Sequence, residues 1–167
     1  MIGLAQRATR ALNRVFLALA SATAVGIFAV ILYDLVMRNA FDAPTLWALD
    51  VSRFLLVYLF FFALAPALQA GSHVSVDVVK HWVSPAAARR LRVAASLLTI
   101  AFGAVLLWQV TRTTADAFLR DEMFPTAVPL RVKYVFWIGP VGTLQFVLTA
   151  IAELAALWTP SSVSRSS

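Results

Sequence analysis

Residues 54–70 read FLLVYLFFFALAPALQA, a run in which no side chain carries a formal charge. A helix of about 20 apolar residues is long enough to cross the hydrocarbon core of a bilayer. As a helix this run would be apolar on every side, so it would face lipid or another membrane protein rather than water. The run therefore predicts a transmembrane helix.

Three further stretches of the chain have the same character. The four apolar stretches are Val15–Leu35, Phe54–Ala70, Val93–Val110 and Val135–Leu157. An unpaired backbone amide in lipid costs several kcal/mol, so each stretch should form a helix that satisfies its own hydrogen bonds. We predict an all-α integral membrane protein with four transmembrane helices in a single domain, residues 1–158, followed by a disordered tail, residues 159–167.

Composition excludes a soluble domain. Hydrophobic residues make up 61% of the chain and charged residues 13%, whereas soluble domains are about 45–50% apolar and about 25% charged. There is no cysteine, which excludes a disulfide, a thiolate metal site and a cysteine nucleophile. The net charge is +6, but the basic residues flank the apolar stretches, where they meet lipid phosphate. We therefore expect anionic lipid headgroups, and no nucleic acid, as partners.

The distribution of basic residues predicts the orientation in the membrane. Arg7, Arg10 and Arg14 share one helical face before the first span, and a second basic group lies between the second and third spans. This second group is Lys80, Arg89, Arg90 and Arg92. The positive-inside rule then puts both termini in the cytoplasm. The first apolar run is too long for a cleaved secretory signal, so we interpret it as a retained helix.

The link between the second and third spans, residues 71–85, has an amphipathic pattern. As a helix it would place Val78, Val79 and Trp82 on one face and polar side chains on the other. It is too short to cross a bilayer, so we predict a short helix lying flat in the interface. In this interpretation, His73 and Asp77 cap or tie down the flat helix, and Ser84-Pro85 starts the third span.

The connection after the first span carries several charged and aromatic residues. Asp34 and Arg38 are spaced to form an ion pair within one helix, Thr45 is placed to cap the next helix, and Trp47 suits the headgroup level. Asp50 and Arg53 lie three residues apart on one helical face. They can either pair with each other or contact a partner subunit or lipid.

The second half of the chain predicts an extension and a bend. The longest connection, Thr111–Leu130, should begin with a helical continuation of the third span through Phe118. In the fourth span, Gly139-Pro140 predicts a bend, and Gly142 predicts a point of close helix packing.

Reactive groups are sparse. Pumps and membrane enzymes place ionisable residues at mid-membrane, but the centres of these four spans carry none. The two histidines, His73 and His81, lie in the link between spans, and no phosphate loop, zinc motif or nucleophile elbow occurs. We expect no catalytic residue, metal or cofactor. Two alternatives remain open: a stand-alone four-helix protein that binds haem or quinone, and a small transporter formed by oligomerisation.

Three motifs, in order, carry a resemblance to a known family. They are Arg38-Asn39-Ala40-Phe41 followed by Pro44, Trp47, Asp50 and Arg53; Gly71-Ser72-His73-Val74-Ser75-Val76-Asp77; and the stretch from Pro129 to Pro140. Over nearly its whole length, the chain resembles the small membrane subunit of tripartite ATP-independent periplasmic (TRAP) transporters, the DctQ-type family. It departs from the family in having Asp50 where glutamate is usual and Ala65-Pro66 where a glycine-alanine pair is frequent.

The resemblance implies an accessory role in the bacterial inner membrane. The chain would brace the large membrane subunit during sodium-coupled uptake of an organic acid captured by a periplasmic substrate-binding protein, and substrate specificity would reside in those two components. From the resemblance and the charge pattern together we predict a set of subunit or lipid contacts. These residues are Arg38, Trp47, Asp50, Arg53, His73, Asp77, Trp82, Arg89 and Arg90.

Overall fold

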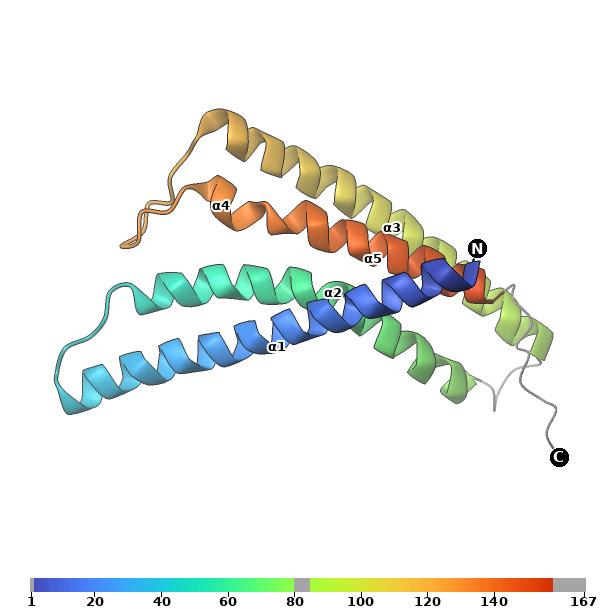
Figure 1. The fold of residues 1–167 in the computed structure, drawn as a ribbon, viewed down its shortest axis with the longest axis horizontal. Helices are drawn as coiled ribbons and strands as arrows, with labels where there is room; N and C mark the ends of the chain where they lie inside the picture. The colour runs from blue at the N-terminus through green and yellow to red at the C-terminus, as the bar shows by residue number, and fades with distance from the viewer. Residues whose placement is uncertain (1, 80–84, 158–167) are drawn as a thin grey trace.

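The computed structural model describes residues 2–79 and 85–157, and this part of the chain is almost entirely helical (Figure 1). Its helices are α1 (Ile2–Ala40), α2 (Ala48–Val79), α3 (Pro85–Arg120), α4 (Val132–Phe136) and α5 (Ile138–Ala156). Four segments are long and apolar enough to cross a membrane: Gln6–Ala40, Ala48–Gly71, Ala86–Arg120 and Val132–Ala156. The predicted all-α fold with four membrane-spanning helices is confirmed.

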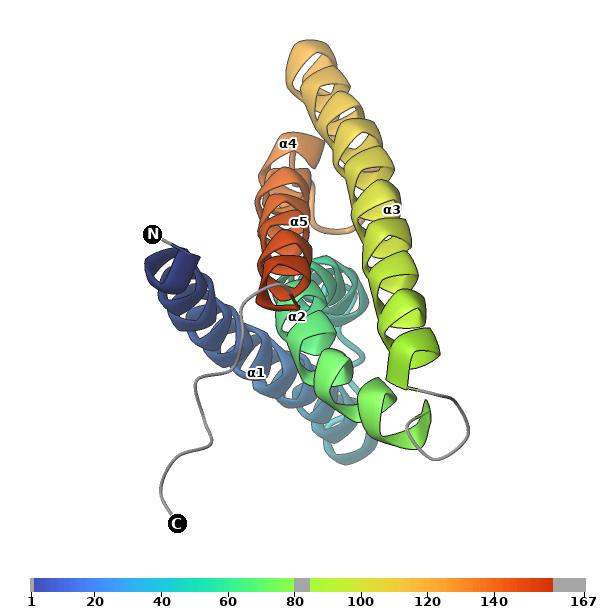
Figure 2. The same cartoon turned by 90° about the vertical axis from the view of Figure 1, so that its right-hand side faces the viewer.

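The helices form two antiparallel pairs that contact each other through α5. One pair is α1 with α2 and the other is α3 with α5, and α5 also packs on α2 and, over a shorter length, on α1. Figure 1 shows the two pairs diverging toward the end that carries the connections 41–47 and 121–131, which we call the loop end. The opposite end, where α1 starts and α5 finishes, is called the termini end. Figure 2 views the molecule from the termini end and shows α5 between α1 and α3.

The core of the molecule is built around α5. In the apolar windows of α1, α2 and α3, 11%, 11% and 6% of the residues are buried, whereas the last window, which lies across α4 and α5, is 50% buried. A Cβ atom built on Gly142 would lie 2.6 Å from the backbone oxygen of Phe61, and one on Gly139 would lie 2.5 Å from the Val110 side chain. Glycine at these positions therefore permits the close contact of α5 with α2 and α3, as predicted for Gly142.

Each connection at the loop end has an aspartate in the left-handed region within its first two residues. Asp42 has φ 50° and Asp121 has φ 49°. Asp tolerates this conformation better than most residues, so it ends a helix in the way that glycine does. The helical extension of the third span is confirmed, since α3 continues to Arg120. Its start at Pro85 also agrees with the prediction.

Two local predictions differ from the structure. Thr45 does not cap α2, because that helix begins at Ala48 and the Val51 backbone N–H donates to the carbonyl of Trp47. A separate flat helix after the second span is not shown. Instead α2 continues to Val79, with Pro66 inside it. After Pro66 no proline occurs up to residue 84, so nothing in this stretch forces the helix to end where the apolar run stops.

Some predictions concern residues that the structure does not describe. Trp82 and the tail 159–167 lie outside the described residues. His73 and Asp77 belong to α2 by their backbone, but their side chains are not described.

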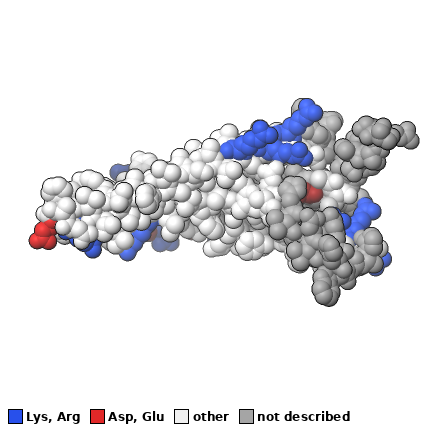
Figure 3. Space-filling model, turned by 90° about the horizontal axis from the view of Figure 1, so that it is seen from below, with Lys and Arg blue, Asp and Glu red and all other residues white. Residues whose placement is uncertain are grey.

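Figure 3 shows one face of the molecule as largely uncharged, with basic side chains grouped toward the termini end.

Candidate functional site

Asp50 connects the start of α2 to the loop before α4. The residue is only 6% exposed, and its Oδ2 accepts a 2.8 Å hydrogen bond from the backbone N–H of Ala127. The Arg53 guanidinium lies 3.6 Å from the other carboxylate oxygen, with 63% of the Arg53 side chain exposed. The predicted Asp50–Arg53 contact is therefore present. The structure adds that Asp50 binds the loop while Arg53 is directed largely outward.

Arg38 lies in the last turn of α1, and Trp47 is the last residue of the connection to α2. The Arg38 guanidinium forms the expected ion pair with Asp34, at 2.8 Å. Asp34 also accepts hydrogen bonds from the backbone N–H and the hydroxyl of Thr45, which fixes the turn. The Trp47 ring lies 5.8 Å from that of Tyr33 and remains 40% exposed. Both residues are available to a partner or to lipid headgroups at the loop end.

The loop 121–131 is held by charges and aromatic rings. Asp121 lies 2.7 Å from both Arg131 and Lys133. The hydrogen bond from Lys133 and the positive charge of Arg131 hold the pKa of the Asp121 carboxyl below its usual value, and these effects outweigh desolvation. An isolated β-bridge joins Met123 to Arg131, and the Phe124 ring packs 5.0 Å from that of Phe54 on α2. The loop, which follows α3, therefore packs on α2.

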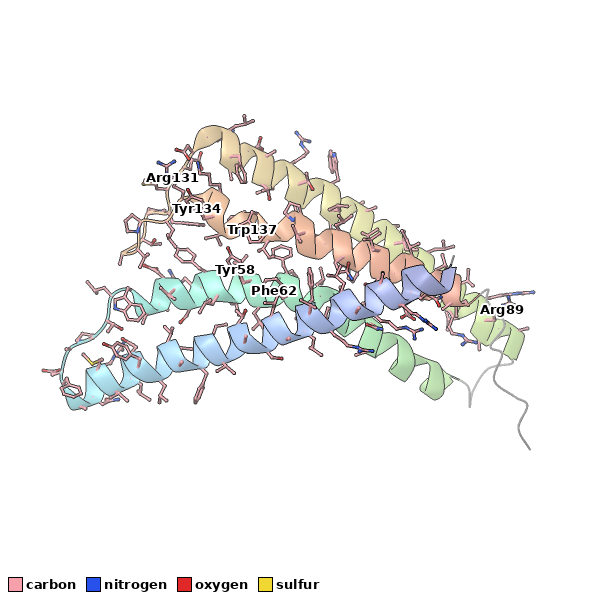
Figure 4. All side chains as sticks on the ribbon, in the orientation of Figure 1. Tyr58, Phe62, Arg89, Arg131, Tyr134 and Trp137 are labelled. Carbon is pink, nitrogen blue, oxygen red and sulfur yellow. The ribbon has the colours of Figure 1, made fainter. Side chains whose placement is uncertain are left out.

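Arg89 and Arg90 lie in the second turn of α3 at the termini end, and Figure 4 labels Arg89 there. Both are exposed. They border an open groove of about 530 Å³, whose other lining residues are Ala86, Val93, Ala94 and Leu97. The nine predicted contact residues therefore do not form one site. Arg38, Trp47, Asp50 and Arg53 belong to the loop end, and Arg89 and Arg90 to the termini end.

A buried cluster of polar side chains that we did not predict joins α1, α2 and α5. The Asn13 Nδ2 donates to Oε1 of Gln69 at 2.8 Å and to the Thr149 hydroxyl at 3.2 Å. Gln145 donates its Nε2 to Oδ1 of Asn13 at 2.7 Å. We call these four residues the amide cluster. The available signal was the spacing of Asn13, Phe16 and Ala20, which places Asn13 on the buried stripe of α1.

The start of the fourth span is a broken helix whose free carbonyls are satisfied by neighbouring helices. Pro140 has no N–H, so the carbonyl of Phe136 lacks the usual donor four residues later, and the Thr114 hydroxyl donates to it at 3.2 Å. The Tyr58 hydroxyl donates to the carbonyl of Tyr134 at 2.6 Å. Figure 4 shows Tyr58 on α2 directed toward the break. The helix is interrupted at Trp137, two residues before the bend predicted at Gly139-Pro140. At this interruption α2 and α3 supply the hydrogen bonds that lipid cannot.

Metal ligation finds no support in the described part of the chain. Among those residues, no group of three or more His, Cys, Asp or Glu side chains lies close enough together to hold a metal ion.

Comparison with known proteins identifies the family. Comparison with curated protein sequences gives no match. Residues 27–160 match the family described as Tripartite ATP-independent periplasmic transporters, DctQ component. The match begins within the first span, includes the other three and covers well over half of the chain. This multi-pass chain therefore belongs to the DctQ family, the small membrane subunits of TRAP transporters.

Proposed function

We propose that this chain braces the large membrane subunit of a TRAP transporter during sodium-coupled uptake of an organic acid. A periplasmic binding protein would deliver the acid, and the large subunit would carry it across the membrane. Membership of the family supports the assignment to such a transporter. The bracing role needs a rigid part that stays fixed while another part moves.

The burial pattern is the observation that carries the proposal. The span across α4 and α5 is 50% buried within the chain, whereas α1, α2 and α3 bury only 6–11% of their apolar windows. The chain thus has a packed centre and three helices whose apolar surface remains for lipid or a large partner to cover. Exposed large side chains on these helices include Phe28, Phe60 and Phe102.

Rigidity comes from contacts that leave little room for sliding. Gly142 lies against the backbone of Phe61, and the Gly103 Cβ position is 2.9 Å from the Val147 side chain. At the loop end, the Asp50–Ala127 hydrogen bond fixes the longest connection to α2. A bundle closed at its centre and at one end resists the deformation that a moving neighbour would impose.

We also propose that the chain lies in the bacterial inner membrane with both termini in the cytoplasm. The basic residues of the termini end, Arg7, Arg10, Arg14, Arg89 and Arg90, would then meet the anionic headgroups of the cytoplasmic leaflet. Trp82 would anchor the same face. Trp47 and Trp137 would lie at the opposite interface, where the indole ring is favoured.

Arg53 provides the sharpest test of the subunit contact. Its side chain is 63% exposed, and its contact with Asp50, at 3.6 Å, is long. Arg53→Ala should lower co-purification with the large subunit several-fold, because a charge-assisted contact is lost. Arg120→Ala is the matched control. That side chain is 71% exposed and has a similar weak pairing, 3.8 Å from Glu122. Unchanged complex yield and unchanged transport for Arg53→Ala would remove Arg53 from the interface.

A further inference from the structure

A polar cavity of about 280 Å³ opens at the termini end beside the amide cluster. It lies between the first turns of α1, the middle of α2 and the last turns of α5. Its lining residues are Gln6, Thr9, Arg10, Asn13, Gln69, Thr149, Ala152, Glu153 and Ala156. Seven of these nine residues have polar or charged side chains, so the cavity suits a polar occupant.

Two buried side-chain atoms, one in the wall of this cavity and one beside it, have no hydrogen-bond partner in the described part of the chain. The Nε2 atom of Gln6, a lining residue, is buried and has no hydrogen-bond partner in the described part of the chain. The Oε1 atom of Gln145, which is bonded to Asn13 through its other side-chain atom, is also buried without a partner. A buried polar atom without a partner costs about 1–3 kcal/mol. An occupant that accepts a hydrogen bond from Gln6 would remove part of that cost.

Two opposite charges border the same cavity without pairing. Arg10 on α1 and Glu153 on α5 both line it, and neither has an ion-pair or hydrogen-bond partner among the described residues. Glu153 is the only acidic residue of α5. A cavity with one cationic and one anionic wall is complementary to a ligand that carries both charges.

The position of the cavity along the helices indicates where such a ligand comes from. Arg10 and Asn13 directly precede the apolar run that begins at Val15, and Glu153 lies in the last turns of α5. Charged groups at this point along a span lie at the headgroup layer of a bilayer. We propose that the cavity binds a phospholipid headgroup that carries a phosphate and a primary amine, the headgroup of phosphatidylethanolamine.

Each part of that headgroup has a matching side chain. The phosphate accepts hydrogen bonds from the Arg10 guanidinium and the Gln6 amide, since both are donors. The ammonium donates to the Glu153 carboxylate. Phosphatidylcholine has no N–H to donate, and phosphatidylglycerol offers only neutral hydroxyls, so neither gives Glu153 a cationic hydrogen-bond donor.

The full chain in nanodiscs that contain equal amounts of phosphatidylethanolamine, phosphatidylcholine and phosphatidylglycerol tests the proposal. Native mass spectrometry of the released protein should show bound phosphatidylethanolamine in about tenfold excess over each of the other two, because one charge-assisted hydrogen bond separates them. Equal retention of the three lipids by the unaltered chain would overturn the proposal without any variant being needed.

Substitutions of Glu153 and Arg10 test the amine contact and the phosphate contact one at a time. Glu153→Gln should reduce the excess over phosphatidylcholine to less than about twofold, since a neutral amide removes the ionic half of the contact. Arg10→Gln should reduce the retention of all three lipids. Arg7→Gln is the control, because Arg7 is exposed on the same helix but does not line the cavity. A Glu153→Gln variant that keeps the full excess would overturn the assignment of the amine to Glu153.

A second measurement distinguishes a lipid from a soluble zwitterion. In nanodiscs of phosphatidylcholine alone, millimolar phosphoethanolamine should raise the melting temperature of the chain less than incorporated phosphatidylethanolamine does. Equal stabilisation by the soluble compound would identify a free zwitterion as the ligand and contradict the lipid proposal.

Discussion

The side-chain amide of Gln145 on α5 donates a 2.7 Å hydrogen bond to Oδ1 of Asn13 on α1, across 132 positions of the chain. Both residues are nearly inaccessible, at 2% and 3% exposed. Asn13 donates in turn to Gln69 on α2 and Thr149 on α5. One asparagine therefore joins three spans at a position where burial within the chain excludes competing partners.

Asn13→Ala should lower the free energy of unfolding by about 1–2 kcal/mol, because the buried Gln145 amide loses its 2.7 Å hydrogen bond to Asn13. Asn39→Ala is the matched control. The Asn39 amide is exposed and donates only to the carbonyl of Leu35 in its own helix. The two values come from denaturant titration in detergent micelles. Equal stability of the two variants would show that the amide cluster contributes nothing.

Gly142→Ala should be strongly destabilising, by about 1–3 kcal/mol. The new methyl group would lie 2.6 Å from the backbone oxygen of Phe61, which cannot rotate away as a side chain can. Gly71→Ala is the control within α2, since nothing lies within 4 Å of its Cβ position. There alanine should be neutral or stabilising, because it favours a helix over glycine by about 1 kcal/mol. Thermal unfolding of both variants checks the packing of α5 on α2.

Thr114→Val should cost about 1 kcal/mol, because the carbonyl of Phe136 loses its donor. In a Pro140→Ala background the new backbone N–H can bond that carbonyl instead, so the same substitution should cost less than half as much. Thr113→Val is the control, since the Thr113 hydroxyl donates only to Gln109 in its own helix. An unchanged cost in the Pro140→Ala background would contradict the role assigned to Thr114.

The ion pairs of Asp121 at the loop end should make the folded chain less stable in acid. The pKa of Asp121 is lowered in the folded chain, chiefly by the hydrogen bond from Lys133. The stabilisation by ionised Asp121 is therefore complete at pH values above the pKa of aspartate in the unfolded chain, about 3.9. It is lost as the pH falls through the lower pKa of the folded chain. Asp121→Asn keeps a residue that tolerates positive φ but does not titrate. The difference in melting temperature between the two proteins should be constant above about pH 5 and should shrink in more acidic buffer. A difference that grows on acidification would contradict the ion pairs.

Much of the fold could be predicted from the sequence because lipid imposes a simple rule. The continuous apolar run at 54–70 predicts a spanning helix, and Gly139-Pro140 predicts an interruption near the start of the fourth span. Both features follow from backbone chemistry alone. The Asp34–Arg38 pair could be predicted for the same reason, because helical spacing is local.

Features set by tertiary contacts could not be predicted in this way. Asp50 and Arg53 lie one helical turn apart, 3.6 Å from each other. The Asp50 carboxylate is nevertheless nearer to the backbone N–H of Ala127, at 2.8 Å, which is 77 positions away in the sequence. Asn13 lies among arginines at the edge of an apolar run, where an exposed position would be the usual expectation. The length of α2 could not be predicted either, because the apolar run stops at Ala70 while the helix continues to Val79.

Transport by a reconstituted system tests the bracing role most directly. Proteoliposomes would contain the large subunit with its binding protein, with and without this chain, or this chain alone. We expect sodium-driven uptake by the complete system, a large loss of uptake without this chain, and neither flux nor a visible absorbance band from the chain alone. Solute movement or a bound haem in the isolated chain would contradict the bracing role.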